Sequence, residues 1–243
     1  MPPDDQEDSP LDLPRTLTRE FLMEGNLAAI LARAVPDLRL LTDDERAASL
    51  QAVLEARPPG PGMAPEDGVW VFAYGSLIWN PAIHFAERRA ARVPGWHRAF
   101  CLSVKAGRGT PANPGLMLGL QPGGACEGAA FRIAPEGVAQ ELALLWRREM
   151  VADGYTPVWV PLEHGGATFA HAIAFTINPA GPSYCGDLAE AEVVRRLATA
   201  QGGLGTAAEY LFRTRDGLRL LGIADTLVER LAELVETHQR SAH

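Results

Sequence analysis

The chain has 243 residues, of which 47% are hydrophobic, and its formal net charge is −8. This length is enough for one sizeable core, or for one core and an accessory piece. The acidic balance argues against nonspecific binding to nucleic acid or to an anionic membrane surface.

The N-terminal residues 1–14 are acidic, contain proline and lack periodicity, which predicts a disordered tail. They show neither the basic start nor the apolar stretch of a signal peptide, and no apolar run is long enough to span a bilayer. The cysteines Cys101, Cys126 and Cys185 show no C-x-x-C spacing and suit a reducing compartment. We therefore expect a cytoplasmic protein without membrane or nucleic-acid partners, present as a monomer or weak dimer.

Residues 15–66 predict an N-terminal helical extension followed by a linker. The stretch from Thr16 to Ala34 favours one helix. A second helix should begin with Thr42 as N-cap and Glu45 completing a capping box, and should end near residue 55. The Pro/Gly-rich run 57–62 then interrupts regular structure.

Residues 67–240 predict a second, strand-rich domain. The expected strands are 69–73, 99–104, 116–120, 128–133, 156–162 and 170–177, with a Gly-Gly turn before the last, and the expected helices are 136–152, 188–200 and 227–237. Because these strands do not alternate regularly with helices, a doubly wound parallel sheet is disfavoured. The pattern favours an α+β fold, with a curved or barrel-like mixed sheet surrounded by helices.

The first of these strands runs directly into the turn Tyr74-Gly75-Ser76-Leu77. A turn at the end of a buried strand leaves backbone N–H groups that can hold a carbonyl oxygen or a carboxylate. The segment is therefore either a binding loop or a core strand followed by an ordinary turn.

Glu149 is the most conspicuous acidic residue. At about 100° per residue, it falls on the same face of the helix 136–152 as Val138, Leu142 and Leu145, while Arg147 points to the opposite side. Burial and the C-terminal end of a helix both raise the pKa of a carboxyl group, which suits general acid/base chemistry.

An alternative for Glu149 is a purely structural one. Buried glutamates are rare unless they are paired. Glu149 would then pair with an arginine such as Arg98 or Arg132, or face solvent beyond the end of the helix.

Other candidate residues carry weaker signals. Ser76 lacks the G-x-S-x-G context of a hydrolase nucleophile, so a binding or turn role is favoured. His164 and His171 flank the Gly-Gly turn without metal-ligand spacing, and Cys101 lies in an apolar strand. Arg108 either binds a substrate carboxylate or faces solvent.

Several segments, taken together, resemble the ChaC family of glutathione-specific γ-glutamylcyclotransferases. The run Val71-Phe-Ala-Tyr-Gly-Ser-Leu-Ile-Trp79 is similar to the family's signature. Further similar segments are 17–23, 95–102, 107–111, 146–150 with Gly154-Tyr155, 204–211 and 221–225. They occur in the family's order over residues 16–237.

The resemblance implies an enzyme that cleaves glutathione into 5-oxoproline and cysteinylglycine, without cofactor or metal, on a small mixed β-barrel with helices outside. By this resemblance, Glu149 corresponds to the family's catalytic glutamate. The loop that holds the γ-glutamyl group is carried over to Ala73, Tyr74, Gly75, Ser76, Leu77 and Ile78, and a pocket-facing tyrosine to Tyr184. Ala73 departs from the family, because many members have glycine there.

The implied reaction is an intramolecular acyl transfer. The α-amine of the substrate attacks its own γ-carbonyl, and one carboxylate, that of Glu149, moves the proton from this amine to the departing amine. Two alternatives remain. One is a cyclotransferase for other γ-glutamyl amino acids or γ-glutamylamines. The other is a noncatalytic binding module, which the presence of Glu149 argues against.

Overall fold

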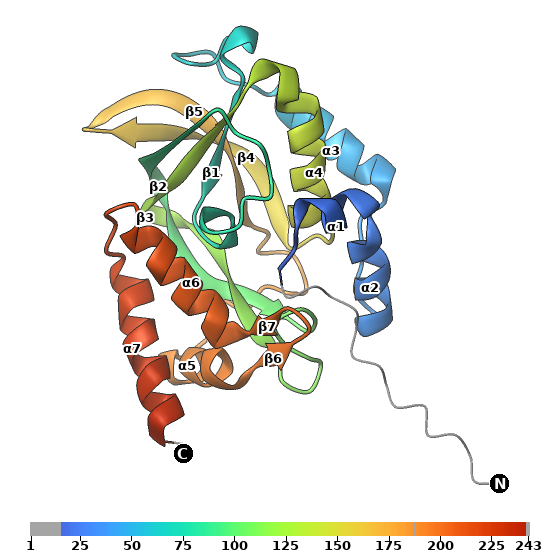
Figure 1. Ribbon diagram of the computed structural model, residues 1–243, viewed down its shortest axis with the longest axis vertical. Coiled ribbons are helices and arrows are strands. Elements are labelled where there is room, and N and C mark those ends of the chain that lie inside the picture. Colours follow the sequence, from blue (N-terminus) through green and yellow to red (C-terminus); the bar gives the residue numbers. More distant parts are fainter. Residues whose placement is uncertain (1–15, 187, 242–243) are drawn as a thin grey trace, which may run out of the picture.

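A computed structural model describes residues 16–186 and 188–241, so the predicted disordered tail lies outside the described residues (Figure 1). Its centre is a closed barrel with the strand order β1-β3-β2-β4-β5. The strands are β1 Val69–Ala73, β2 Glu87–Val104, β3 Gly115–Ile133, β4 Tyr155–His164 and β5 Ala167–Ile177. Strand β1 runs parallel to β5, and the other pairs are antiparallel. The predicted mixed barrel is thereby confirmed.

Strands β2 and β3 form a hairpin much longer than the sequence predicted. The separate strands expected at 116–120 and 128–133 are parts of β3, and the first half of β2 was not predicted at all. The pairing shifts register between Pro94 and Trp96 and again between Phe100 and Leu102. Such bulges break the alternation of inward and outward side chains, so the apolar pattern marks only fragments of each strand.

The N-terminal extension forms the helices α1 Arg19–Glu24, α2 Asn26–Ala34 and α3 Asp43–Glu55. The single helix expected from Thr16 to Ala34 is wrong, because Gly25 adopts a left-handed conformation (φ 75°) and ends α1. The capping box of α3 is confirmed, since the Thr42 hydroxyl accepts from the Glu45 amide and the Glu45 carboxylate accepts from the Thr42 amide at 2.8 Å.

The remaining helices are α4 Val138–Glu149, α5 Glu190–Thr199, α6 Ala207–Arg219 and α7 Thr226–Ser241. Short strands β6 Gln201–Gly202 and β7 Gly205–Thr206 precede α6, and 3₁₀ turns lie at Pro65–Asp67, Ser76–Ile78 and Pro135–Gly137. Helix α6 was not predicted. In Figure 1, α5–α7 lie on one side of the barrel and α1–α4 on the other.

The extension packs against α4, the helix that carries Glu149. Arg19 on α1 makes two hydrogen bonds, of 2.5 and 2.8 Å, to the Glu141 carboxylate on α4. Beyond α4, the Val151 carbonyl accepts a hydrogen bond of 3.1 Å from the amide of Leu41. These contacts hold α4 from outside the barrel, the first near its start and the second just beyond its end.

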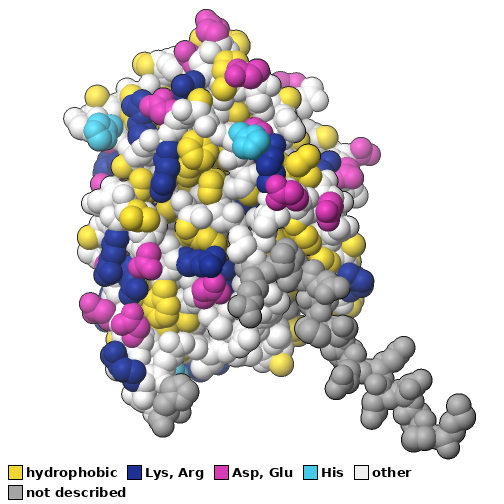
Figure 2. All heavy atoms as spheres, in the orientation of Figure 1, with side chains coloured by type: hydrophobic (Ala, Val, Ile, Leu, Met, Phe, Trp, Pro, Cys, Tyr) yellow, Lys and Arg dark blue, Asp and Glu magenta, His cyan; other side chains and the backbone are white. Residues whose placement is uncertain are grey.

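A continuous apolar core joins the barrel to the surrounding helices, and in it the rings of Trp146 on α4 and Phe175 on β5 pack edge to face at 5.2 Å. Cys101 is fully buried, as expected, and burial raises the pKa of its thiol to about 12. On the face shown in Figure 2, acidic and basic side chains lie interspersed. Among the described helices, none is long and apolar enough to cross a membrane.

Candidate active site

Glu149 is the last residue of α4, and its side chain is 13% exposed. Leu142 and Leu145 on the same face are buried, which confirms the predicted apolar stripe. Burial raises the pKa of Glu149, and the neighbouring Arg148 guanidinium opposes this shift because its Nε lies 2.9 Å from Oε1. The balance remains in favour of a raised pKa.

The partner of Glu149 differs from the two arginines considered from the sequence. Arg98 pairs with Asp225, and Arg132 pairs with Glu87. Glu149 is therefore a paired, mostly buried carboxylate. Glu149 lines the two cavities described below.

The turn after β1 is shaped by Gly75. A Cβ atom at this position would lie 2.6 Å from the hydroxyl oxygen of Tyr210 on α6. A side chain here would force the turn or the Tyr210 ring to shift, so glycine lets the 3₁₀ turn Ser76–Ile78 begin directly after the strand with the Tyr210 hydroxyl close by.

The turn and Glu149 meet in a narrow inner recess of about 20 Å³. Its lining residues are Tyr74, Gly75, Ser76, Leu77, Leu118, Glu149, Tyr155, Phe175 and Tyr210. This volume is close to the minimum that holds a single water-sized group, about 10–15 Å³. The recess therefore has room for one small polar group beside the carboxylate.

Tyrosine hydroxyls surround this recess. Tyr74 donates to the Phe175 carbonyl at 2.5 Å, and Tyr155 donates to the Leu118 carbonyl at 2.8 Å. Tyr210 accepts from the Leu118 amide at 3.4 Å. Burial raises the pKa of each of these phenols, that of Tyr210 to about 12, so they stay protonated at neutral pH.

Arg148 connects the carboxylate to the turn. Its Nη2 donates to the Ser76 hydroxyl at 2.9 Å and its Nη1 to the Asn80 carbonyl at 2.5 Å. An arginine cannot take a proton from a serine, so this contact gives Ser76 no general base. The arrangement favours a binding or positioning role for Ser76.

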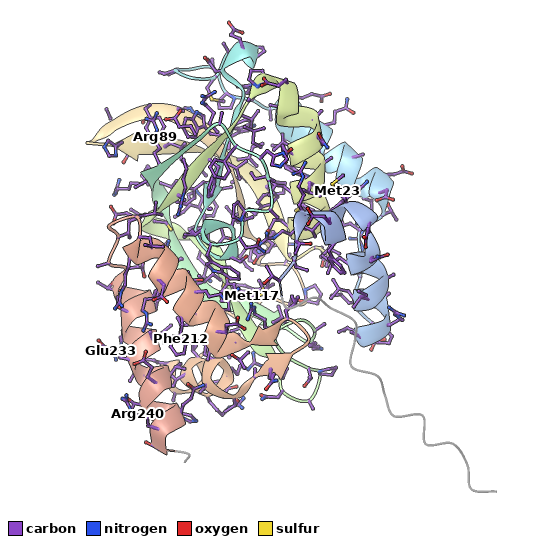
Figure 3. All side chains as sticks on the ribbon, viewed as in Figure 1. Met23, Arg89, Met117, Phe212, Glu233 and Arg240 are labelled. Carbon is purple, nitrogen blue, oxygen red and sulfur yellow. The ribbon has the colours of Figure 1, made fainter. Side chains whose placement is uncertain are left out.

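A larger outer cavity of about 280 Å³ shares Ser76, Glu149 and Tyr155 with the recess. The N-terminal extension contributes Leu17, Leu27, Leu31, Val35, Asp37 and Leu38 to its wall. The end of β2 and the loop after it contribute residues 102–107, and β3 contributes Met117. Figure 3 labels Met117 in the middle of the view, between the N-terminal helices and α6. The two cavities meet at Glu149.

Three of the residues carried over from the family do not line either cavity. Ala73 is the buried last residue of β1 and pairs with Ala129. Ile78 packs against Gly217 of α6. Tyr184 accepts a hydrogen bond of 2.7 Å from the Gln121 side chain, although its neighbours Pro182 and Ser183 do line the outer cavity.

Arg108 neither faces solvent nor lines these cavities. It is buried, donates to the Thr206 carbonyl at 2.8 Å and lies over the rings of Trp79 and Tyr210. Its contacts hold the start of α6, and with it Tyr210. In the part of the chain that the structure describes, no group of three or more His, Cys, Asp or Glu side chains is placed to hold a metal ion.

Sequence reasoning did not identify Arg148, Tyr155 or Tyr210 as site residues. Tyr155 is the first residue of β4, directly after Gly154, so its position near the end of α4 was visible in the sequence. Tyr210 lies on the helix that was not predicted, and no local pattern points from it to the turn.

Comparison with known proteins gives a consistent picture. The family model described as ChaC-like protein matches residues 69–238. The glutathione-specific γ-glutamylcyclotransferase of Escherichia coli K12 is 42% identical over 209 residues, which cover 86% of this chain and 87% of the relative. The γ-glutamylcyclotransferase 2-1 of Arabidopsis thaliana is 37% identical over 154 residues, or 60% of this chain and 71% of the relative.

Among solved structures, a yeast γ-glutamylcyclotransferase specific to glutathione has the same fold. It superimposes with a TM-score of 0.65 at 24% identity, covering 72% of this chain and 98% of the yeast chain.

Proposed function

The chain belongs to the family of ChaC-like proteins, and from this premise we propose that it is a γ-glutamylcyclotransferase, a lyase that cleaves glutathione into 5-oxoproline and cysteinylglycine. One observation carries the proposal: the buried carboxylate of Glu149 shares a recess with the turn Tyr74–Leu77. We assign the chemistry to residues 67–240, with Glu149 as the catalytic residue.

The reaction requires protons to move from one nitrogen to another. The Glu149 carboxylate removes a proton from the substrate's α-ammonium group, and the freed amine attacks the γ-carbonyl carbon. The new C–N bond closes the five-membered ring, and Glu149 returns its proton to the leaving nitrogen. The regenerated carboxylate then takes the second proton, which the attack leaves on the ring nitrogen, as the amide bond to cysteine breaks, and passes it to the released amine. The two protons lost by the α-ammonium group thus end on cysteinylglycine as its ammonium group, so charge and atoms balance without a covalent enzyme intermediate.

The surroundings of Glu149 suit this cycle. A pKa raised by burial brings the carboxyl closer to neutral pH, where it can both accept and return a proton. The recess has room for a single oxygen, which fits the developing oxyanion or one oxygen of the α-carboxylate against the backbone of the turn. The rest of the γ-glutamyl group then lies where the recess opens into the outer cavity.

Holding the substrate folded is the second contribution of the site. The turn and the ring of tyrosines keep the amine and the carbonyl of one molecule close together, which lowers the entropic cost of ring closure. The 280 Å³ outer cavity offers space for a leaving peptide. This favours glutathione over γ-glutamylamines, which have no peptide to place there.

The test is a turnover assay with Glu149→Gln. Removing the proton carrier should lower 5-oxoproline formation from glutathione by about 10²–10⁴-fold, while glutathione binding measured by calorimetry persists. Glu136→Gln, on the exposed 3₁₀ turn that precedes the same helix, is the matched control and should retain wild-type activity. Near-wild-type release of cysteinylglycine by Glu149→Gln would overturn the assignment.

A second variant separates this mechanism from nucleophilic catalysis. Ser76→Ala should reduce turnover by less than about tenfold, because it removes only one hydrogen bond from Arg148. Loss of activity as complete as in Glu149→Gln, together with trapping of an acyl-enzyme on Ser76 in the wild-type protein, would indicate a serine nucleophile instead.

A further inference from the structure

Part of the wall of the outer cavity lies outside the segment that the family model matches. Leu27 and Leu31 of α2, and Val35 and Leu38 after it, line the cavity. All four precede residue 69, where the match to the family model begins. The N-terminal extension thus contributes apolar surface directly beside the cavity that opens from Glu149.

Lys105 adds a cation to the lining of this cavity. It is the only lysine of the sequence, directly follows the end of β2 and lines the cavity with an exposed side chain. Within residues 16–186 and 188–241, no carboxylate lies within ion-pair distance of its ammonium group. The inner cation, Arg148, is instead paired with Glu149.

The charges of the cavity therefore differ between its ends. The inner end holds a matched pair, Arg148 and Glu149, whereas the Lys105 side offers a positive charge for a ligand. Asp37, on the connection between α2 and α3, also lines the cavity. Its negative charge repels an anion from the part of the wall that the extension forms. A ligand carboxylate is thus directed toward Lys105.

We propose that Lys105 and the apolar wall of the extension form the subsite for the leaving peptide. In this subsite the Lys105 ammonium binds the C-terminal carboxylate of glutathione, and Leu27, Leu31 and Val35 contact the cysteinylglycine portion. The inference rests on the proposed function and adds a specificity rule: preferred substrates carry a carboxylate at the end remote from the γ-glutamyl group.

The kinetic test compares glutathione with its glycine monoethyl ester, which lacks that carboxylate charge. Lys105→Gln should lower kcat/KM for glutathione roughly three- to tenfold because KM rises, and it should leave kcat/KM for the ester unchanged. Lys105→Arg should retain the preference for the free acid. The charge-matched control is Arg230→Gln, which removes a surface cation on α7 that pairs with Glu190. It should change kcat/KM for neither substrate.

Two outcomes would overturn the assignment of Lys105. One is an equal loss of kcat/KM for glutathione and for its ester in Lys105→Gln. The other is an unchanged kcat/KM for both substrates. Absence of 5-oxoproline from both substrates with the wild-type protein would instead contradict the proposed function, so the two failures are distinguishable.

A binding measurement gives a readout that is independent of turnover. Because Lys105 is the only lysine, acetylation with an amine-reactive ester can be followed at this single side chain by peptide mass spectrometry. Saturating cysteinylglycine should slow its acetylation severalfold, and cysteinylglycine amide should protect much less. Equal rates with and without cysteinylglycine would contradict the subsite.

The apolar wall is tested separately with Leu31→Ala. This truncation removes contact with the leaving peptide but no charge, so KM should rise about threefold for glutathione and ester alike. An unchanged KM for both substrates would remove the extension from the subsite.

Discussion

The guanidinium of Arg148 and the carboxylate of Glu149 are paired side by side at the end of α4, with 2.9 Å between Nε and Oε1. Consecutive residues of a helix point about 100° apart, so the two groups meet only because their long side chains turn toward each other where the helix ends. The pair holds the carboxylate in one orientation and limits how far burial raises its pKa.

The first prediction concerns the pH dependence of activity in Arg148→Gln. Without the cation, burial acts alone on Glu149 and its pKa rises further. Since the reaction needs the ionised carboxylate as base, the acid limb of the kcat/KM profile should move to higher pH. The measurement is 5-oxoproline formation from glutathione across a pH series.

The neighbouring Arg147 provides the control. It is exposed and donates to the Met23 carbonyl, so Arg147→Gln should leave the acid limb in place. If the acid limb of the kcat/KM profile does not move in Arg148→Gln, a group other than Glu149 determines that limb.

The second prediction concerns Gly75→Ala. The new methyl group would meet the Tyr210 hydroxyl at 2.6 Å, so the turn or the tyrosine must move, at a cost of about 1–3 kcal/mol in stability and with a clear loss of kcat. Adding Tyr210→Phe should restore part of the stability, because it removes the atom in collision. Chemical denaturation of the single and double variants measures this coupling.

Gly137→Ala is the matched control for this substitution. A Cβ there meets its neighbours at 3.6 Å or more, and the φ of −96° suits alanine, so stability should stay the same or rise by about 0.4–1 kcal/mol. If Gly75→Ala behaves as Gly137→Ala does, the close approach of Tyr210 does not constrain the turn.

The third prediction concerns stability and pH. The pKa of Glu149 in the folded protein is raised above its ordinary value of 4.5, so folding favours the protonated carboxyl. Its contribution to stability is fully present below the unfolded pKa and is lost as the pH rises through the folded pKa. Relative to Glu149→Gln, the wild-type protein should therefore lose stability as the pH increases from about 4 toward neutrality.

Urea denaturation of both proteins across this range provides the measurement. The difference in unfolding free energy should fall with pH and then level off above the folded pKa. A difference that instead grows with pH would show that the Arg148 pair outweighs burial.

The fourth prediction concerns the ion pair that anchors the extension. In Arg19→Gln the Glu141 carboxylate, only 3% exposed, loses both of its hydrogen bonds from the guanidinium. We expect a loss of about 2–3 kcal/mol in the free energy of unfolding, below the fully buried limit because the Arg19 side chain is 15% exposed. The double variant with Glu141→Gln should recover part of it.

The exposed pair of Arg230 and Glu190 serves as the reference. Arg230→Gln should cost no more than about 0.5 kcal/mol by the same denaturation assay. Equal costs for Arg19→Gln and Arg230→Gln would indicate that the extension is held by its apolar contacts alone.

Features that depend on short stretches of sequence could be predicted. Thr42 and Glu45 lie three residues apart and make the expected capping box. Residues 69–73 form the expected buried strand, and the helical phase of Glu149 correctly places it beside buried leucines. Each of these depends on neighbours within about one or two helical turns or on simple alternation.

Features that depend on distant contacts could not be predicted. The bulges of β2 and β3 interrupt the alternation that marks a strand, and Tyr210 reaches the turn from a helix about 130 residues further along the chain. The pairing of Glu149 with Arg148 rather than Arg98 depends on where α4 ends and on the nearby Asp225, which takes Arg98. Sequence spacing carries no information on such choices.

The cysteines, of which Cys101 and Cys126 are buried and Cys185 is partly buried, have a consequence for redox chemistry. Burial raises the pKa of Cys101 to about 12 and of Cys126 to about 11, and it also raises the pKa of Cys185. Because the thiolate is the form that attacks disulfides, these side chains react slowly in thiol–disulfide exchange. The buried thiols of Cys101 and Cys126 are therefore poor partners for a mixed disulfide with a thiol peptide or its disulfide.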